Sequence, residues 1–140
     1  RIDILASHHA PHTRADKELE FDRCPSGMPG VEAMYPLMMR QMREGDIPLE
    51  RLVDAISTRP AKILGLRDRG RIAPGLRADL AVFDVHSETK MTEDGCHYKC
   101  GWNPYDGFPA IFPKHVLFKG GFLIRNGNFE GEKGEGSLVF

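Results

Sequence analysis

The hydrophobic pattern of this chain changes period along its length, and that change constrains the fold more than any other feature. Between Val31 and Leu66, apolar residues recur at intervals of three and four, as they do on one face of an α-helix. After Gly70 the pattern becomes short apolar runs separated by turn residues, as in β-strands. The sequence therefore predicts an α/β protein, with helices in its first half and mostly strands in its second.

Helix and strand signals set the expected elements. The opening run, Ile2 to Ser7, is apolar and bounded by polar residues, which predicts a buried strand. It is followed by a long irregular stretch from His8 to Gly30, and loops of that length are usually functional or disordered. The expected strands of the second half are Asp79–Val85 and a pair within His115–Arg125 joined by a Gly-Gly turn, with a further turn at Asn126-Gly127.

Three helices are expected between about Val31 and Leu66. Gly45 should end the first, Pro48 should start the second, and Ser57 or Thr58 should cap a short third that ends at Gly65. Pro36 removes an amide donor and should therefore lie in the first turn of the first helix. The buried face of that helix is predicted to consist of Val31, Met34, Tyr35, Met38, Met39 and Met42.

Composition excludes several classes of protein. Hydrophobic residues make up 41% of the 140, which is enough for a core. With 19 basic and 20 acidic residues the formal charge is −1, so no nucleic-acid or membrane surface is expected. No apolar run approaches the roughly 18 residues of a membrane helix. Three cysteines and no visible secretory leader favour a reduced, cytoplasmic setting.

Three histidines follow directly after the opening apolar run. A strand that delivers polar residues from its carboxyl end into a long loop is how βα-barrel enzymes build active sites. His8, His9 and His12 are therefore candidates for metal binding or acid–base chemistry, because neutral imidazole serves in both. A plain surface cluster of histidines remains the alternative, since His8 and His12 are four residues apart but no helix is expected to carry them.

Several longer motifs together resemble one family of enzymes. HAPHT at residues 9–13, followed by Lys17 and CPSGMPGVE at 24–32, resembles the last barrel strand and following loop of dihydroorotases. Three further stretches match in the same order: STRPAKILGL at 57–66, GRIAPGLRADLAVFD at 70–84 and KCGWNPYDG at 99–107. The resemblance covers nearly the whole chain. Hydantoinases and allantoinases share the architecture and are separated from this chain less firmly.

The resemblance implies a fold and a place within it. The chain resembles the C-terminal portion of a metal-dependent hydrolase, beginning at its last strand, because a complete TIM-like barrel takes roughly 250 residues. Residues 1–66 would supply the last barrel strand, the substrate loop and helices. Residues 67–140 would supply strands of the small β-sandwich domain and a C-terminal tail.

The resemblance also implies a reaction and site residues. The family opens or closes the cyclic amide of dihydroorotate, interconverting it with carbamoyl-aspartate in pyrimidine biosynthesis, and uses zinc held mainly by earlier barrel strands. His8 stands where the family has an aspartate that binds metal and moves the proton, so His8 is the candidate catalytic and metal-ligating residue. Imidazole is bulkier than a carboxylate and is not an anionic base. His12 matches the residue that holds the substrate carboxylate, and Pro25 to Gly27 match a loop that presents backbone groups to it.

Two functional readings remain open. The motifs around residues 9–13 and 24–32 favour a cyclic amidohydrolase, whereas His8 in place of aspartate favours a non-catalytic relative that assembles with aspartate transcarbamoylase. In either case the 140-residue chain alone is expected to bind zinc weakly or not at all and to be inactive. The exposed edge of the opening strand, or the Met-rich helix face, is expected to promote self-association.

Three other residues and one motif carry weaker signals. Cys96, His97 and Cys100 form only half of a zinc-binding pattern, so a structural or incidental role is expected. Lys17 is predicted to be solvated and Cys24 to be packed. Trp102 is predicted to pack against the β part, with stacking near the site entrance as the alternative.

Overall fold

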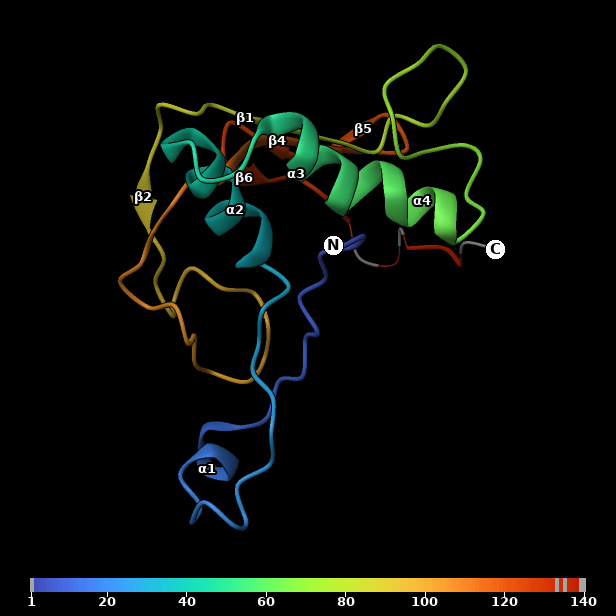
Figure 1. The fold of residues 1–140 in the computed structure, drawn as a ribbon. Coiled ribbons are helices and arrows are strands. Elements are labelled where there is room, and N and C mark those ends of the chain that lie inside the picture. Colours follow the sequence, from blue (N-terminus) through green and yellow to red (C-terminus); the bar gives the residue numbers. More distant parts are fainter. Residues whose placement is uncertain (1, 133, 135, 139–140) are drawn as a thin grey trace.

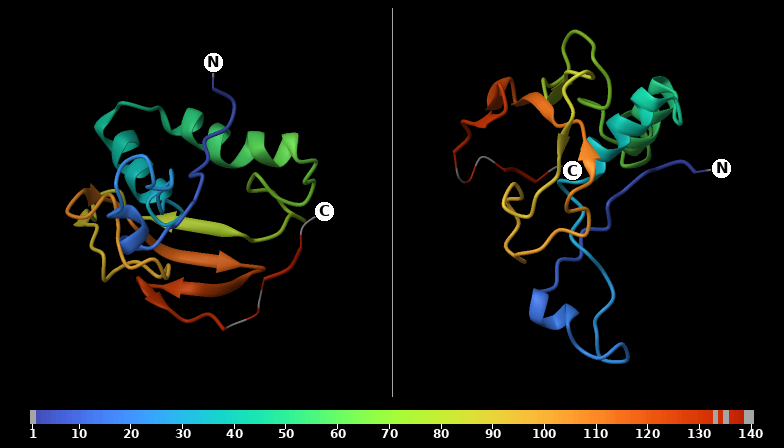
Figure 2. Two further views of the ribbon diagram at one scale, coloured as in Figure 1. Left: turned by 90° about the horizontal axis from the view of Figure 1, so that it is seen from below. Right: turned by 90° about the vertical axis from the view of Figure 1, so that its left-hand side faces the viewer.

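Helices cover one face of an antiparallel sheet, and a long arm projects from this body (Figures 1 and 2). The structure is a computed structural model that describes residues 2–132, 134 and 136–138. The arm comprises residues 8–30 and carries the short helix α1, Arg14–Lys17, near its tip. Within the described ranges, no helix has the length and apolar character needed to cross a membrane.

Helix α2 spans Met34–Glu44 and agrees with its predicted pattern. Pro36 lies in the first turn and is buried, and Gly45 ends the helix in the left-handed conformation with φ 87°. Met39 is buried, and Met38 and Met42 pack beside it. Val31 lies outside the helix and is 52% exposed, so it does not belong to the buried face as predicted.

The second and third predicted helices form one continuous helical run. It consists of α3 (Leu49–Val53), a π-helical turn (Asp54–Thr58) and α4 (Arg59–Ile63). Pro48 precedes the run and Gly65 closes it, as predicted, with Leu66 N–H donating to Ala61 O at 2.8 Å.

The predicted cap at Ser57 or Thr58 is wrong. Thr58 has helical backbone angles, and its hydroxyl donates to Gly70 O at 2.9 Å instead of capping α4. Pro60 has no N–H to offer the carbonyl four residues before it, at Ile56. That carbonyl accepts from the Tyr35 hydroxyl at 3.3 Å, and the chain passes Pro60 through the wider π turn rather than by restarting the helix.

The main sheet contains four antiparallel strands in the order β1-β4-β5-β6. Their bounds are β1 Leu80–Phe83, β4 Pro113–Phe118, β5 Gly121–Arg125 and β6 Asn128–Phe129. A separate pair is formed by β2, Thr89–Lys90, and β3, Pro109–Ala110. The strands predicted at 79–85 and within 115–125 are thus confirmed.

Both tight turns of the main sheet use two consecutive residues with positive φ. Asn126 and Gly127 have φ 51° and 81°, which confirms the predicted turn. The preceding hairpin turns at Lys119 and Gly120, with φ 53° and 86°, and Gly121 already begins β5. The predicted Gly-Gly turn is therefore displaced by one residue.

The predicted strand at Ile2–Ser7 is not formed. Residues 2–7 carry no strand assignment, and their one backbone–backbone hydrogen bond among the described residues joins Leu5 N–H to Ala55 O at 3.1 Å. A strand requires a neighbouring strand to bond along its length, and none of the described residues provides one here. Further on, His9 and Met28 form an isolated parallel bridge.

The core joins residues from both predicted parts of the chain. Ala33 packs with Met91 and Ala110, and Met39 packs with Leu52 and Ile111. Phe83 and Val85, around the end of β1, pack against the second of these clusters. The helices and the β-rich half are therefore held together by shared apolar burial.

Candidate functional site

The projecting arm is braced near its tip, at the first turn of α1. The hydroxyl and backbone N–H of Thr13 both donate to the Asp16 carboxylate, at 2.6 and 3.0 Å, and the Asp16 N–H bonds back to the Thr13 hydroxyl. This capping box fixes the chain directly after His12. The side-chain hydrogen bond from Thr13 lowers the pKa of Asp16, so this carboxyl stays ionised and keeps the brace in place.

The loop at residues 24–30 folds back against the histidine segment. His12 Nε2 lies 3.1 Å from Ser26 O, and the Lys17 ammonium donates to Pro25 O at 2.8 Å. Lys17 is thus a part-buried brace, and the prediction that it is solvated is wrong. Cys24 is partly buried beside it, with Sγ 3.8 Å from Lys17 O, as expected for a packed thiol.

Gly27 packs closely against the histidine segment. Its φ is 116°, and a Cβ built there would lie 2.7 Å from the Ala10 Cβ and 3.2 Å from the Ala10 carbonyl oxygen. Only glycine fits both the backbone angle and the space. The structure thereby brings His12, Pro25 and Gly27 together, as the resemblance implied.

His9 has a structural role. Its Nδ1 accepts hydrogen bonds from the backbone N–H groups of Gly30 and Val31, at 3.1 and 3.4 Å. Its ring lies 5.6 Å from the ring of Tyr98. His9 therefore anchors the end of the loop where the chain enters the helical layer.

An open pocket of about 500 Å³ lies where the arm joins the body. Its lining consists of Ser7, His8, Lys17, Gly27, Met28, Trp102 and Pro104. His8 is exposed in a left-handed backbone conformation with φ 46°, which is uncommon for a non-glycine residue. Two of the predicted site residues, His8 and Gly27, line this pocket. His12 and Pro25 do not line the pocket, but both lie close to Gly27, which does.

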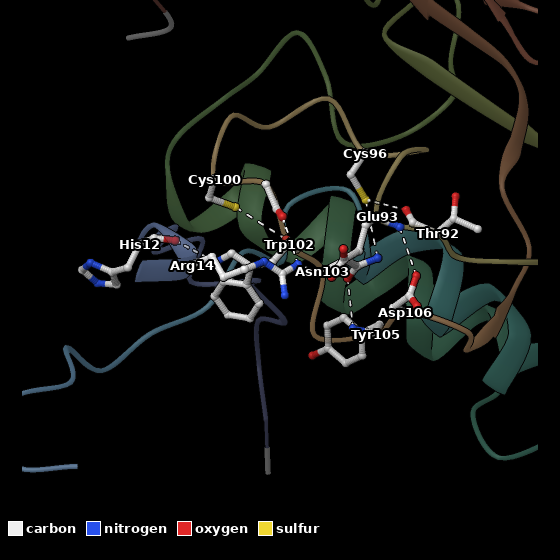
Figure 3. Close-up of polar contacts among 11 residues, drawn as sticks. His12, Arg14, Thr92, Glu93, Cys96, Cys100, Trp102, Asn103, Tyr105 and Asp106 are labelled. Atoms are coloured by element: carbon white, nitrogen blue, oxygen red, sulfur yellow. Dashed lines mark hydrogen bonds and ion pairs between the residues drawn. The ribbon is translucent and has the colours of Figure 1, made fainter. Parts of the chain in front are cut away.

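A loop distant in the sequence completes this site. The indole N–H of Trp102 donates to the carbonyl of His12 at 2.7 Å, and Arg14 bonds to Glu93 at 2.7 Å and to Gly101 O at 3.2 Å (Figure 3). Trp102 thus lines the pocket at the arm, a position compatible with the alternative predicted for it. The hydrogen bond to His12 had no signal in the sequence, because it joins residues 90 positions apart.

Two larger pockets lie along α4, and both are lined by charged side chains. One, of about 620 Å³, contains Arg59 bonded to Asp3 and Asp54. The other, of about 680 Å³, contains Arg69, which pairs with Asp68 and Asp79. Arg59 and Arg69 are thus held in structural ion pairs. Of these three pockets, the one at the arm is lined by predicted site residues, namely His8 and Gly27.

The described residues do not form a metal site. A catalytic zinc ion requires three protein ligands, and no group of three His, Cys, Asp or Glu residues in the described part of the chain is arranged to hold one. Burial raises the pKa of the Cys96 thiol, which opposes the thiolate form that zinc binds. His97 instead lies 2.8 Å from Glu32. His8, the predicted metal ligand, would supply only one of the three ligands that a catalytic zinc ion requires.

The chain belongs to the amidohydrolase family, whose model matches residues 22–102. Within that family its sequence is similar to dihydroorotases: it is 44% identical to the enzyme of Archaeoglobus fulgidus over 126 residues and 35% identical to that of Methanosarcina acetivorans over 140. These matches cover 90% and 99% of this chain. The predicted resemblance is confirmed.

Solved structures of the same family share the fold. A D-hydantoinase (dihydropyrimidinase) from Thermus sp. superposes with a TM-score of 0.92 at 33% identity, covering 98% of this chain and 31% of that one. An L-hydantoinase (dihydropyrimidinase) from Arthrobacter aurescens superposes with a TM-score of 0.86 at 29% identity, covering 94% and 30%. The chain likewise spans 30% of the length of both dihydroorotases named above.

Proposed function

We propose that this chain is the substrate-orienting portion of a dihydroorotase-type cyclic amidohydrolase. The observation that carries the proposal is the 44% identity to the Archaeoglobus fulgidus dihydroorotase across 90% of this chain. The pocket at the arm supports it, because it gathers a polar loop, a glycine and an aromatic wall at one place. The substrate would be dihydroorotate or carbamoyl-aspartate. Water adds to the ring carbonyl and the C–N bond breaks, or the reverse.

The proposal assigns roles to the site residues. His12 binds the substrate carboxylate, and Pro25 and Gly27 present backbone groups to the substrate from the loop that Lys17 holds. His8 occupies the position of the proton-transferring residue. Zinc is expected of the whole protein on the family resemblance alone. His8 is the candidate ligand within this chain, and the other ligands would come from outside it. Apart from His8, the assigned roles are limited to binding and orientation.

The proposal also places the chain within a larger architecture. Residues 1–66 would contribute the last barrel strand, loop and helices, and residues 67–140 would contribute part of a small β-sandwich. In this setting Ile2–Ser7 would find the neighbouring strand that the described residues do not provide. A cytoplasmic location is part of the proposal and rests on the low cysteine content.

A chimera tests the proposal directly. The 126-residue segment of the Archaeoglobus fulgidus dihydroorotase that matches this chain is replaced by the corresponding segment of this chain, with His8 or with His8→Asp. Ring opening of dihydroorotate is followed by absorbance with zinc supplied. We expect turnover with His8→Asp at least about 100-fold above that with His8, because positioned proton transfer contributes about 10²–10⁴-fold. The 140-residue chain alone should show no turnover in either form.

A second function is favoured by His8 itself. An imidazole at the aspartate position fits a non-catalytic relative that assembles with aspartate transcarbamoylase. A folded chimera inactive in both forms would contradict the enzyme proposal. Co-elution of the parent protein with aspartate transcarbamoylase would then support the second function. Hydantoin, offered to the active chimera beside dihydroorotate, distinguishes a hydantoinase-type substrate preference.

A further inference from the structure

The loop at residues 92–107 is braced internally and tied to the core. Glu93 N–H donates to the Asp106 carboxylate at 3.0 Å, and Tyr105 N–H donates to the Asn103 side-chain oxygen at 3.0 Å. Gly107 N–H bonds to the carbonyl of Met91, whose side chain is fully buried. Asn103 itself is only 5% exposed. A side chain carried by this loop is therefore held in a fixed place relative to the core.

Trp102 projects from this loop to the backbone of the histidine segment. Its indole N–H reaches the His12 carbonyl, while the His12 imidazole points away on the far side (Figure 3). The contact thus fixes the backbone that carries the imidazole and does not compete for the imidazole nitrogens. The ion pair between Arg14 and Glu93 provides a second, exposed connection two residues further along.

Trp102 also forms part of the pocket wall. The pocket lining includes Trp102 and Pro104 on one loop and Gly27 and Met28 on the other. A rigid aromatic side chain suits the flat face of a six-membered ring, because stacking on it costs little conformational entropy. The same side chain therefore meets the pocket and holds His12.

We propose that Trp102 is the positioning residue of this site, holding His12 through its indole N–H and offering its ring as the wall against which the substrate ring lies. This inference rests on the proposed function for the identity of the substrate. It adds a residue outside the histidine segment and the Pro25–Gly27 loop, and it explains why the two distant loops meet.

The chain offers an unusually clean test, because Trp102 is its single tryptophan. Replacing tryptophan by β-(3-benzothienyl)-alanine in the 140-residue chain removes the N–H and keeps the size and shape of the ring. Trp102→Phe is a second variant that can be made by ordinary mutagenesis. Arg14→Gln is the matched control, since it removes a different connection between the two loops and leaves the pocket wall intact.

Two measurements decide the proposal. Without ligand, nuclear Overhauser contacts between the His12 ring and Gly27 should weaken in the benzothienyl form and in Trp102→Phe but persist in Arg14→Gln. Dihydroorotate, titrated by NMR, should bind about three- to tenfold more weakly to the benzothienyl form, as expected for one lost hydrogen bond. Unchanged His12 contacts and unchanged affinity would overturn the proposal. If no form binds dihydroorotate, the proposed substrate and the wall role fail together, while the ligand-free contacts still decide whether Trp102 positions His12.

Discussion

His9 and His12 lie three residues apart and have different surroundings, which makes them separable by mutation. His9 accepts two backbone hydrogen bonds at the end of the loop, and His12 contacts the Ser26 carbonyl beside Gly27. We expect His9→Ala to lower the free energy of unfolding by about 1 kcal/mol, because two amides lose their acceptor. We expect His12→Ala in the active chimera to weaken dihydroorotate binding about tenfold or more, as for a lost hydrogen bond to a charged group.

Urea denaturation and binding calorimetry measure the two effects separately. The informative result is the crossover: one variant loses stability and the other loses affinity. If both variants lost affinity equally, the assignment of the substrate carboxylate to His12 would be wrong.

Comparing Gly27 with Gly45 distinguishes two costs of replacing glycine by a larger residue, namely backbone strain at positive φ and steric overlap of the added Cβ. Both have positive φ, but a Cβ at Gly27 would meet Ala10 at 2.7 Å, whereas a Cβ at Gly45 meets nothing within 4 Å. Gly45→Ala should therefore cost about 1 kcal/mol of stability from backbone strain, and Gly27→Ala about 3 kcal/mol or more from strain plus overlap. Equal costs in urea denaturation would show that the loop at residues 24–30 yields freely, contrary to the close packing described above.

At the scale of elements, the π turn between α3 and α4 depends on a contact from α2. Pro60 leaves the Ile56 carbonyl without its helical donor, and the Tyr35 hydroxyl takes that place. Burial raises the pKa of Tyr35 above its ordinary value of 10.0. The unfolded chain therefore loses this proton first, so the contribution of Tyr35 is fully present below about pH 10 and is lost as pH rises through the folded pKa.

We expect this pH dependence to disappear in Tyr35→Phe. The difference in unfolding free energy between the native chain and Tyr35→Phe should be constant up to about pH 10 and should shrink above it. Subtracting the two curves removes the titration of other groups. Urea denaturation at several pH values measures the difference, and a difference that stayed constant up to pH 11 would contradict the assignment.

The elements that could be predicted are those whose signals are local. The methionine spacing of α2 and the Asn126-Gly127 turn report geometry within a few residues, so both were correct. Ile2–Ser7 was wrongly predicted as a strand. Its apolar run shows only that the segment is able to pair, and a strand forms only where a neighbouring strand is present. Thr58 was wrongly predicted as a helix cap. The helix continues past Pro60 because the Tyr35 hydroxyl bonds to the Ile56 carbonyl, and that contact comes from a distant part of the sequence.

The site divides in the same way. The histidine segment and the glycine loop are near in sequence and carry family motifs, so His12 and Gly27 could be placed together. Lys17 read as solvated, since nothing in a charged stretch indicates that one ammonium will reach the Pro25 carbonyl. The hydrogen bond from Trp102 depends on the complete fold. The proximity of the candidate site residues could therefore be predicted from sequence, whereas the contacts that hold them in place could not.

At the scale of the whole molecule, the extended segment Ile2–Ser7 is a surface open to another chain. Ile2 is 69% and Ile4 37% exposed, and little of the segment's backbone is bonded within the described residues. The other surface predicted to associate was the Met-rich face of α2. That face is not available to another chain, because Met39 is buried in the core. We therefore predict self-association through Ile2–Ser7.

Light scattering across a range of protein concentrations tests this prediction. Ile4→Lys should reduce association, because a charge on an exposed edge disfavours pairing, while leaving the unfolding free energy nearly unchanged. A clean monomer at high concentration, or association unaffected by Ile4→Lys, would contradict it.

The hydrogen bond between Trp102 and His12 also has a consequence for the order in which the molecule assembles. The hairpins β4–β5 and β5–β6 close through two-residue turns, so they bring together residues already near in the chain. The bond from Trp102 to His12 closes a span of 90 residues, and the entropy of closing so long a loop is recovered only after the helices and sheet have packed. The pocket is therefore a late product of folding. A nascent chain carries no working version of it until residue 102 has been made, and a defect in either half of the molecule is felt there.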